Sequence, residues 1–268
     1  MGDQVESDIL LSEMAGGILR LTLNDQKRRN ALSETMLAQL SDAFAKAALD
    51  PSVRVIVLAG NGPAFCAGHD LKEITAARSG EDNGKAYFKA LFDTCASLMQ
   101  LIVRNPKPVI AEVATVATAA GCQLVASCDL AMAADSALFA TPGVNIGLFC
   151  STPMVALSRN VSNKHAMEML LTGDMVSAEK AQQIGLINKC FSAEALTEQT
   201  MAMADKIAAK SSMTLAVGKR AFYEQAEMPL EEAYIHASEV MVDNMLRQDA
   251  QEGIGAFIEK RAPNWQDR

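Results

Sequence analysis

The chain has 268 residues, half of them hydrophobic, and a formal net charge of −8. This length can bury one large α/β core, alone or with an appendage, and the acidic balance argues against a nucleic-acid partner. No apolar run is long and charge-free enough to predict a membrane span, and the acidic first residues carry no targeting pattern.

The cysteines and histidines indicate neither disulfides nor a metal. The six cysteines form no Cys-x-x-Cys pair and lie mostly among apolar residues, so we expect reduced core residues. Three scattered histidines predict no metal site. Reduced thiols without a targeting pattern predict a cytoplasmic protein.

Strands and helices alternate in the first part of the chain. Residues 9–11 and 18–23 predict two strands with a glycine turn between them. Ser33 is expected to cap a helix whose apolar residues lie on one face through Phe44. The polar loop before it contains the cations Lys27 and Arg28. These side chains either belong to a solvated surface or contact a phosphate group.

Two loops made of small residues are candidate ligand-binding segments. Residues 53–58 predict a buried parallel strand, and the loop 64–72 follows at its carboxyl end, where ligands bind in open α/β folds. Small residues at Ala67 and Gly68 would let a ligand approach main-chain N–H groups. Residues 118–122 then lead from a second strand into a helix, whose first N–H groups are unpaired. The alternative for each loop is an ordinary turn.

The remainder of the chain is predicted to be increasingly helical. Residues 75–85 predict a mobile loop, and a long amphipathic helix follows through residue 102. From residue 193 onward the sequence predicts only helices. Asp249 with Glu252 matches a capping box at the start of the last one. We expect a core of residues 1–195 and a helical region of residues 196–268, whose apolar side chains pack on the core or on another subunit.

The two small-residue loops together resemble the oxyanion segments of the enoyl-CoA hydratase/isomerase (crotonase) family. Residues 65–72 are similar to the first segment and residues 119–124 to the second. The resemblance implies an α/β fold, a crotonase-like β-spiral of ββα units with a C-terminal helical trimerisation region, assembled as a homotrimer or a dimer of trimers. Residues 140–153, with 121–129, resemble one particular subgroup of the family.

What the resemblance implies for function is the processing of acyl-CoA thioesters by a lyase or isomerase, in fatty-acid or related metabolism. Coenzyme A would be part of the substrate, with no separate cofactor. The N–H groups of His69 and Ala120 would bind the thioester oxygen. The resemblance assigns coenzyme A contacts to Lys27, Arg28, Ala31, Ala67, Asp70, Leu71, Lys72, Gly121 and Lys260.

The chain departs from the hydratase pattern at both catalytic glutamates. Gln123 occupies the first position and Gly143 the second. An amide orients water but exchanges no proton near neutral pH, and glycine has no side chain to do either. Classical hydration is therefore expected to be weakened. The alternatives are a binding protein without turnover or a thioester hydrolase, and the His69 imidazole and the Cys150 thiol are further candidate groups.

Overall fold

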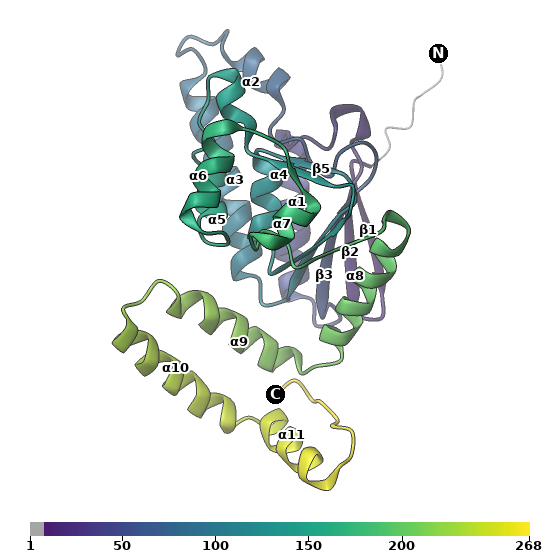
Figure 1. Cartoon of the computed structure of the whole chain (residues 1–268). Coiled ribbons are helices and arrows are strands. Elements are labelled where there is room, and N and C mark those ends of the chain that lie inside the picture. The colour runs from purple at the N-terminus through teal and green to yellow at the C-terminus, as the bar shows by residue number, and fades with distance from the viewer. Residues whose placement is uncertain (1–7) are drawn as a thin grey trace.

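The computed structural model describes residues 8–268. The prediction that the first residues carry no targeting pattern concerns residues 1–7 and lies outside this range. Within it the chain forms two sheets surrounded by helices, with a helical arm at the carboxyl end, as Figure 1 shows. The predicted α/β class is confirmed.

A six-stranded sheet in the order β1-β2-β3-β4-β6-β9 forms the centre of the core. β1 and β2 correspond to the two strands predicted at residues 9–11 and 18–23, although β1 continues to Ala15; they pair antiparallel, and the remaining pairs are parallel. The predicted strand at residues 53–58 is β3, which is buried and apolar as expected for a parallel strand covered on both faces. The strand bounds are Leu10–Ala15 (β1), Ile18–Leu23 (β2), Val55–Gly60 (β3), Val109–Val113 (β4), Leu130–Ala134 (β6) and Lys189–Phe191 (β9).

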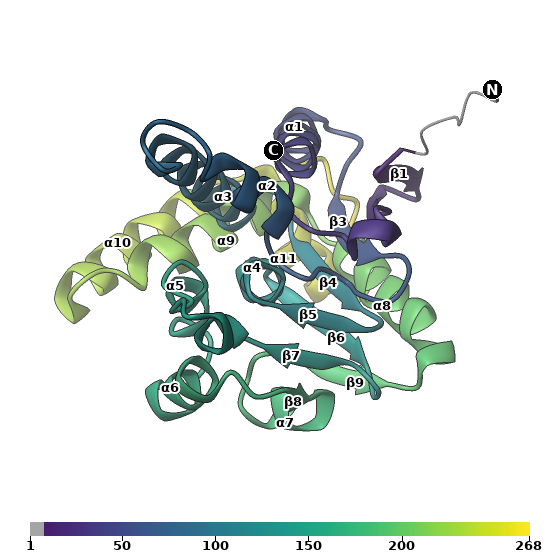
Figure 2. The ribbon, with the colours of Figure 1, turned by 90° about the horizontal axis from the view of Figure 1, so that it is seen from above.

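A smaller sheet and a set of helices cover the large sheet. The small sheet has the order β5-β7-β8. Figure 2 shows α8 on one side of the large sheet and α4 on the other. The bounds of these strands and of the core helices are Val116–Thr118 (β5), Leu138–Ala140 (β7), Val176–Ser177 (β8), Gln26–Arg28 (η1), Glu34–Leu49 (α1), Leu71–Ala77 (α2), Lys85–Arg104 (α3), Ala120–Ser127 (α4), Pro142–Ile146 (η2), Pro153–Leu157 (α5), Asn163–Thr172 (α6), Ala178–Gln183 (α7) and Ala193–Ala208 (α8).

Local sequence signals account for most of the helices. The Ser33 hydroxyl accepts a hydrogen bond from the Met36 N–H at the start of α1, which confirms the predicted cap. The loop expected from residue 75 is wrong in its first part, because α2 continues to Ala77. The Asp70 side chain caps the start of α2 by accepting a hydrogen bond from the Lys72 N–H.

One charged residue, Glu112, lies inside β4 and is almost completely buried. Its two oxygens accept hydrogen bonds from the Arg20 guanidinium at 2.6 and 2.8 Å, and the Thr197 hydroxyl donates to it at 2.9 Å. A buried carboxylate without partners is costly, and these donors offset that cost. Glu112 thus joins β2, β4 and α8.

The sequence prediction did not anticipate that α3 is long and apolar enough to cross a membrane. It is the one helix of residues 8–268 that passes this test of length and composition. A single such helix is weak evidence, because core helices of other proteins pass too. One side of α3 is buried in the core, through Leu91, Cys95, Leu98, Met99 and Ile102.

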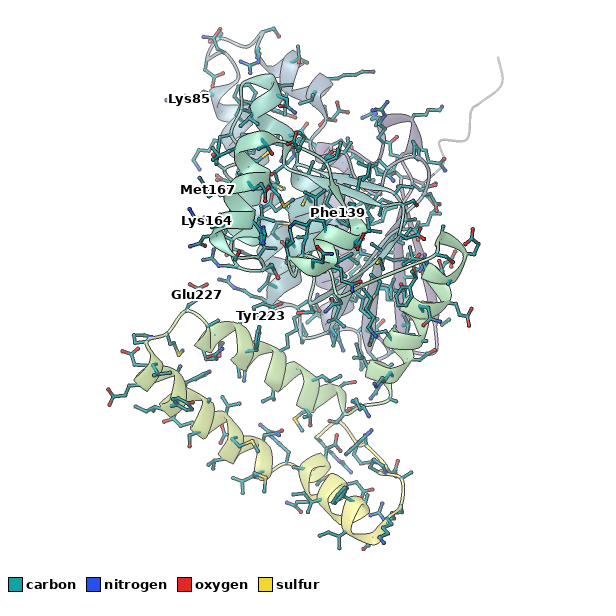
Figure 3. All side chains as sticks on the ribbon, in the orientation of Figure 1. Lys85, Phe139, Lys164, Met167, Tyr223 and Glu227 are labelled. Atoms are coloured by element: carbon teal, nitrogen blue, oxygen red, sulfur yellow. The ribbon has the colours of Figure 1, made fainter. Side chains whose placement is uncertain are left out.

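The last three helices form an arm that stands away from the core in Figure 1. They are α9 (Ser212–Gln225), α10 (Leu230–Met245) and α11 (Gln248–Glu259). Large apolar side chains are exposed on the arm, among them Phe222, Leu230, Tyr234, Leu246, Phe257 and Ile258. Figure 3 shows Tyr223 on the side of α9 that faces the core. The boundary expected at residue 195 stays a prediction, and α8, which spans it, packs on the sheet.

The capping box predicted from Asp249 and Glu252 does not form. Arg247 occupies the cap position of α11, and Asp249 is buried inside the first turn. The Asp249 carboxylate accepts hydrogen bonds from the Gln266 and Asp267 N–H groups at 2.7 and 2.9 Å. The N–H groups that donate to the Asp249 carboxylate therefore belong to the C-terminal segment, and not to the first turn of α11 as the capping box predicts.

Replacing Asp249 by alanine should destabilise the arm. The change leaves two N–H groups without their acceptor, which typically costs about 1–3 kcal/mol. We expect a lower free energy of unfolding in urea and faster hydrogen exchange at residues 262–268. Asp243→Ala, at an exposed position of α10, is the matched control and should change neither. Equal behaviour of the two variants would contradict the anchoring role of Asp249.

Candidate oxyanion site

The loop after β3 is held in place by a buried asparagine. Asn30 Nδ2 donates to the carbonyl oxygens of Asn61 at 2.8 Å and Ala64 at 2.7 Å. A Cβ at Gly60 would lie 2.8 Å from the Phe65 carbonyl oxygen, so the end of the strand requires glycine for the loop to turn back. The Asn30 side chain thus satisfies two backbone carbonyl groups of a loop that is distant from it in the sequence.

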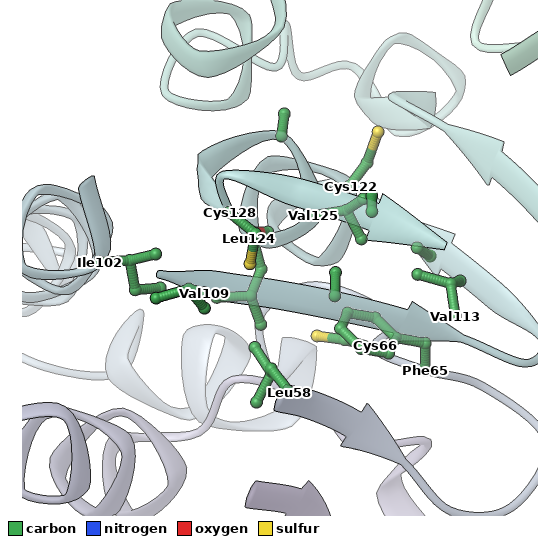
Figure 4. Packing of buried hydrophobic residues seen from close by; sticks show 14 of the residues in the cluster. Leu58, Phe65, Cys66, Ile102, Val109, Val113, Cys122, Leu124, Val125 and Cys128 are labelled. Atoms are coloured by element: carbon green, nitrogen blue, oxygen red, sulfur yellow. The ribbon is translucent and has the colours of Figure 1, made fainter. Parts of the chain in front are cut away.

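Phe65 and Cys66 anchor the same loop in the core. Both are fully buried, and Figure 4 shows them between β3 and β4, near Leu58 and Val113. Cys66 also bonds through its backbone to the entrance of α4: its N–H donates to the Val116 oxygen, and its carbonyl accepts from the Thr118 N–H at 3.0 Å. The two loops predicted to bind ligand are therefore bonded to each other.

Two glycines allow these loops to approach more closely than side chains would permit. A Cβ at Gly121 would lie 2.1 Å from the Cys66 carbonyl oxygen, which no packing can accommodate. Gly68 has a φ of +93°, and a Cβ there would lie 2.9 Å from Ala119 Cβ and 3.4 Å from the Ala120 nitrogen. The structure thus brings the residue before His69 against the first residue of α4.

The N–H groups of His69 and Ala120 have no acceptor among residues 8–268. Ala120 is the first residue of α4, where intrahelical partners are absent. The preceding residue, Ala119, has a φ of +52° and a ψ of −119°, a strained conformation for a residue with a side chain. Two free donors on adjoining loops can together bind one oxygen that carries negative charge.

The His69 side chain is held beside these donors. Its Nδ1 lies 3.3 Å from the Leu32 carbonyl oxygen, which assigns the proton to Nδ1. Nε2 is buried without a partner, and the ring lies edge-on to Phe92 at 5.5 Å between centroids. Burial lowers the pKa of the imidazole, and the bond to Leu32 opposes this. The net lowering of the pKa favours the neutral ring.

The charged residues of this loop divide into paired and exposed groups. The Asp70 carboxylate accepts from the Lys72 N–H at 2.8 Å and lies 3.4 Å from the Arg28 guanidinium. Arg28 also lies near Asp25 and Glu73, so its charge is largely compensated. The ammonium groups of Lys27 and Lys72 belong to exposed residues at the same loop.

The other predicted contact residues are distributed as follows. Ala31 and Gly121 are buried, Ala67 is half-buried, and Leu71 is exposed at the start of α2. Lys260 follows α11 at the far end of the arm, and within one chain the structure does not bring it to the loops (Figure 1).

Gln123 is one helical turn into α4 and almost completely buried. Its N–H donates to the Ala119 carbonyl, but its side-chain Oε1 is buried without a partner. A buried acceptor of this kind typically costs about 1–3 kcal/mol. Folds retain such costs at functional sites, and Gln123 lies in the same helix as the Ala120 donor.

Gly143 lies in a part of the chain that closes tightly around it. A Cβ at this position would lie 2.7 Å from the Leu148 carbonyl oxygen and 2.9 Å from Cys150 Sγ. Leu148 also donates its N–H to the Gly143 carbonyl at 2.9 Å. Any side chain here requires movement of the backbone at 148, a constraint that the sequence did not reveal.

The six cysteines are free thiols, and five of them, all except Cys190, are subject to the effect of burial. Burial raises the pKa of Cys150, which the Gly143 N–H opposes, and raises those of Cys66, Cys95 and Cys122 to about 12. Because the thiolate is the nucleophile, a raised pKa argues against the nucleophilic role considered for Cys150. Of residues 8–268, no group of three metal-ligating side chains assembles.

Two grooves lie apart from the oxyanion loops. One, of about 330 Å³, lies between α6 and α7 and includes His165 and Lys180. The other, of about 440 Å³, lies between α9 and α11 and includes Trp265. Neither is lined by the loops at 65–70 or 119–123, so the candidate site is identified from its N–H groups and not from a cavity.

A family model described as enoyl-CoA hydratase/isomerase matches residues 13–268. Enoyl-CoA hydratase domain-containing protein 3 of Mus musculus is 47% identical over 264 residues, covering 98% of this chain and 86% of that protein. The structure of the human protein of that name has a TM-score of 0.91 and 46% identity, with 96% and 100% coverage. An enoyl-CoA hydratase structure from Mycobacterium smegmatis has a TM-score of 0.92 and 51% identity, with 96% and 98% coverage.

These comparisons confirm the family and the subgroup predicted from residues 140–153, and they correct one expectation. The relatives from Mus musculus, Rattus norvegicus, Xenopus laevis, Danio rerio and Homo sapiens are all named as mitochondrial. The predicted cytoplasmic location is therefore wrong, and these names indicate mitochondria instead. Reduced, buried cysteines report a reducing environment and do not distinguish the two compartments.

Gly143→Ala should destabilise the protein, because the added Cβ meets a carbonyl oxygen. Overpacking of this kind typically costs about 1–3 kcal/mol. Gly218→Ala is the matched control: its Cβ meets no atom within 4 Å in α9, and removing a helical glycine should stabilise by up to about 1 kcal/mol. Urea unfolding of both variants measures the contrast. If both variants changed the free energy of unfolding in the same direction, the packing described at Gly143 would be contradicted.

Proposed function

The chain belongs to the enoyl-CoA hydratase/isomerase family, and we propose that it binds acyl-CoA thioesters and stabilises their enolate through the His69 and Ala120 N–H groups. The observation that carries the proposal is that both donors lack acceptors on loops held together by Gly68 and Gly121. An oxygen placed between them would satisfy both.

The chemistry follows from the charge that such a site stabilises. When a nucleophile adds to a conjugated thioester, or a proton leaves the carbon beside the carbonyl, negative charge gathers on the thioester oxygen. Fixed N–H donors lower the energy of that state without reorganising, and removal of one such donor typically costs about 10²–10³ in rate. The substrate class is therefore acyl-CoA, in fatty-acid or related metabolism.

For the coenzyme we propose contacts from the same loops. Lys27 and Lys72 are exposed and suited to the phosphates, whereas the charge of Arg28 is compensated by Asp25, Asp70 and Glu73. The small residues Ala31, Ala67 and Gly121, with Leu71, would border the remainder of the molecule.

We further propose assembly as a homotrimer or dimer of trimers. The exposed apolar side chains of the arm support it, because surface of this kind is typically covered in an assembly. Assembly would also explain Lys260, which one chain holds far from its own site. A neighbouring subunit could present it there.

The acid–base groups decide between an active enzyme and a binding protein. Gln123 cannot exchange a proton, and Gly143 admits no side chain without backbone movement. General acid–base catalysis contributes about 10²–10⁴ in rate, so water addition should be slow. The first candidate is a lyase or isomerase that relies on the oxyanion donors. The second, favoured by these two residues, is an acyl-CoA-binding protein without turnover.

His69→Pro should abolish the function of the donor pair, because proline has no N–H. With crotonyl-CoA as substrate, we expect about 10²–10³ lower turnover, or correspondingly weaker binding if wild-type protein does not turn over. His69→Ala keeps the N–H and is the matched control, with far-UV circular dichroism to verify folding. Proline and alanine variants of equal activity would show that this N–H is not used.

Gln123→Glu should distinguish the two candidate functions. A carboxylate at this position restores a proton acceptor, and we expect at least about ten-fold faster hydration of crotonyl-CoA. Gln123→Met, similar in size, is the control and should give no gain. Calorimetric titration of wild-type protein with crotonyl-CoA completes the test. Absence of binding would contradict both the enzyme and the binding protein.

A further inference from the structure

The helix that carries the Ala120 donor ends close to the attachment of the arm. Every residue of α4 is buried, and its eight residues span about 12 Å. Two residues after it, Asp129 precedes β6. A short buried helix moves as one body, so a displacement at its end at Ser127 would reach the N–H at its start.

Asp129 is bonded to the arm by two residues of α9. Lys219 Nζ donates to Asp129 Oδ2 at 2.7 Å and to the carbonyl oxygens of Ile102 and Lys107 at 3.1 and 3.0 Å. The Tyr223 hydroxyl donates to Asp129 Oδ1 at 2.9 Å. The Lys219 side chain is only 8% exposed, and its three N–H donors all have acceptors.

Asp129 is equally well bonded to the sheet. Its carboxylate accepts from the Val109 N–H at 2.7 Å, and its own N–H donates to the Val109 carbonyl at 3.0 Å. The same side chain thus connects the start of β4 with the middle of α9. Removing either Lys219 or Tyr223 would loosen this connection without touching the oxyanion loops.

The other contacts between α9 and the core are less buried. No residue of the helix is fully buried, although most are half-buried. Just before the helix, Arg54 donates to the Lys210 carbonyl oxygen at 2.6 Å, and it also pairs with Asp267 at 2.9 Å. Between the end of α5 and the turn after α9, the Arg159–Glu227 pair is exposed on both sides, and pairs of that kind contribute little. The buried, charge-assisted bonds of Lys219 are the stronger constraint.

We propose that Asp129, Lys219 and Tyr223 are positioning residues, which hold the arm and α4 in one fixed relation and thereby set the Ala120 donor for acyl-CoA. This inference rests on the proposed function. Displacement of an oxyanion donor by a fraction of an ångström weakens its bond to the ligand, and a helix shift at an attachment point is a common way to produce one.

The test uses the double variant Asp129→Asn with Lys219→Met in the full chain, which removes both charges together and leaves no unpaired buried ion. Crotonyl-CoA affinity is measured by calorimetry, with thermal unfolding and sedimentation on the same samples. We expect affinity to fall by at least about five-fold, the lower end of typical coupling between sites. Hydrogen exchange of the amides at 120–123 should become faster.

Two further variants make the result specific. Glu227→Gln breaks the exposed pair between arm and core and should leave affinity within two-fold of wild type. Tyr223→Phe removes one hydroxyl from the cluster and should lower affinity in the same direction as the double variant, by less. If the double variant does not fold, Tyr223→Phe provides the test of the cluster in its place.

Unchanged affinity and exchange in the folded cluster variants would overturn the inference. A loss of affinity that only follows loss of assembly, measured by sedimentation, would overturn it as well, because the effect would then come from the partner subunit. Failure of wild-type protein to bind crotonyl-CoA would contradict the proposed function instead. The exchange rates at 120–123 would still test the connection between the arm and α4.

Discussion

The contact between the loop after β3 and the start of α4 is the constraint on which the candidate site depends. It exists because Gly121 has no Cβ to meet the Cys66 carbonyl and because Gly68 adopts a positive φ beside Ala120. Phe65 and Cys66 anchor the loop in the core, and Asn30 holds its start. Backbone rigidity, more than any catalytic side chain, is what this part of the molecule provides.

The same region combines two unpaired N–H donors with two residues that carry no acidic group, Gln123 and Gly143. Gln123 keeps its side chain buried in α4 with an unpaired oxygen, and the backbone at Leu148 closes over Gly143. The path of the chain, as well as the residue type, therefore keeps an acidic side chain away from position 143. Under the proposed function, such a site would favour reactions limited by charge on the thioester oxygen over reactions limited by proton transfer.

The arm attaches to the core through polar contacts at the amino ends of β4 and β6, whereas the candidate site follows the carboxyl end of β3. Lys219 and Tyr223 meet Asp129 just beyond α4, and Asp249 holds the C-terminal segment against α11. Charge-assisted hydrogen bonds are directional, whereas the exposed apolar face of the arm is not. These polar contacts thus orient the arm on the core, and the apolar surface of the arm stays exposed in the single chain, where the proposed assembly would cover it.

The sequence by itself predicted most of the strands and helices and the two small-residue loops, because hydrophobic period and capping act within a few residues. The resemblance to the crotonase family pointed to Gln123 and Gly143, and their residue types show that neither carries a carboxylate. Only the tertiary structure decided that Gly68 meets Ala120, that Leu148 excludes a side chain at Gly143, and that Asp249 binds residues 266 and 267. These contacts join segments distant along the chain, and their distances depend on how complete elements pack.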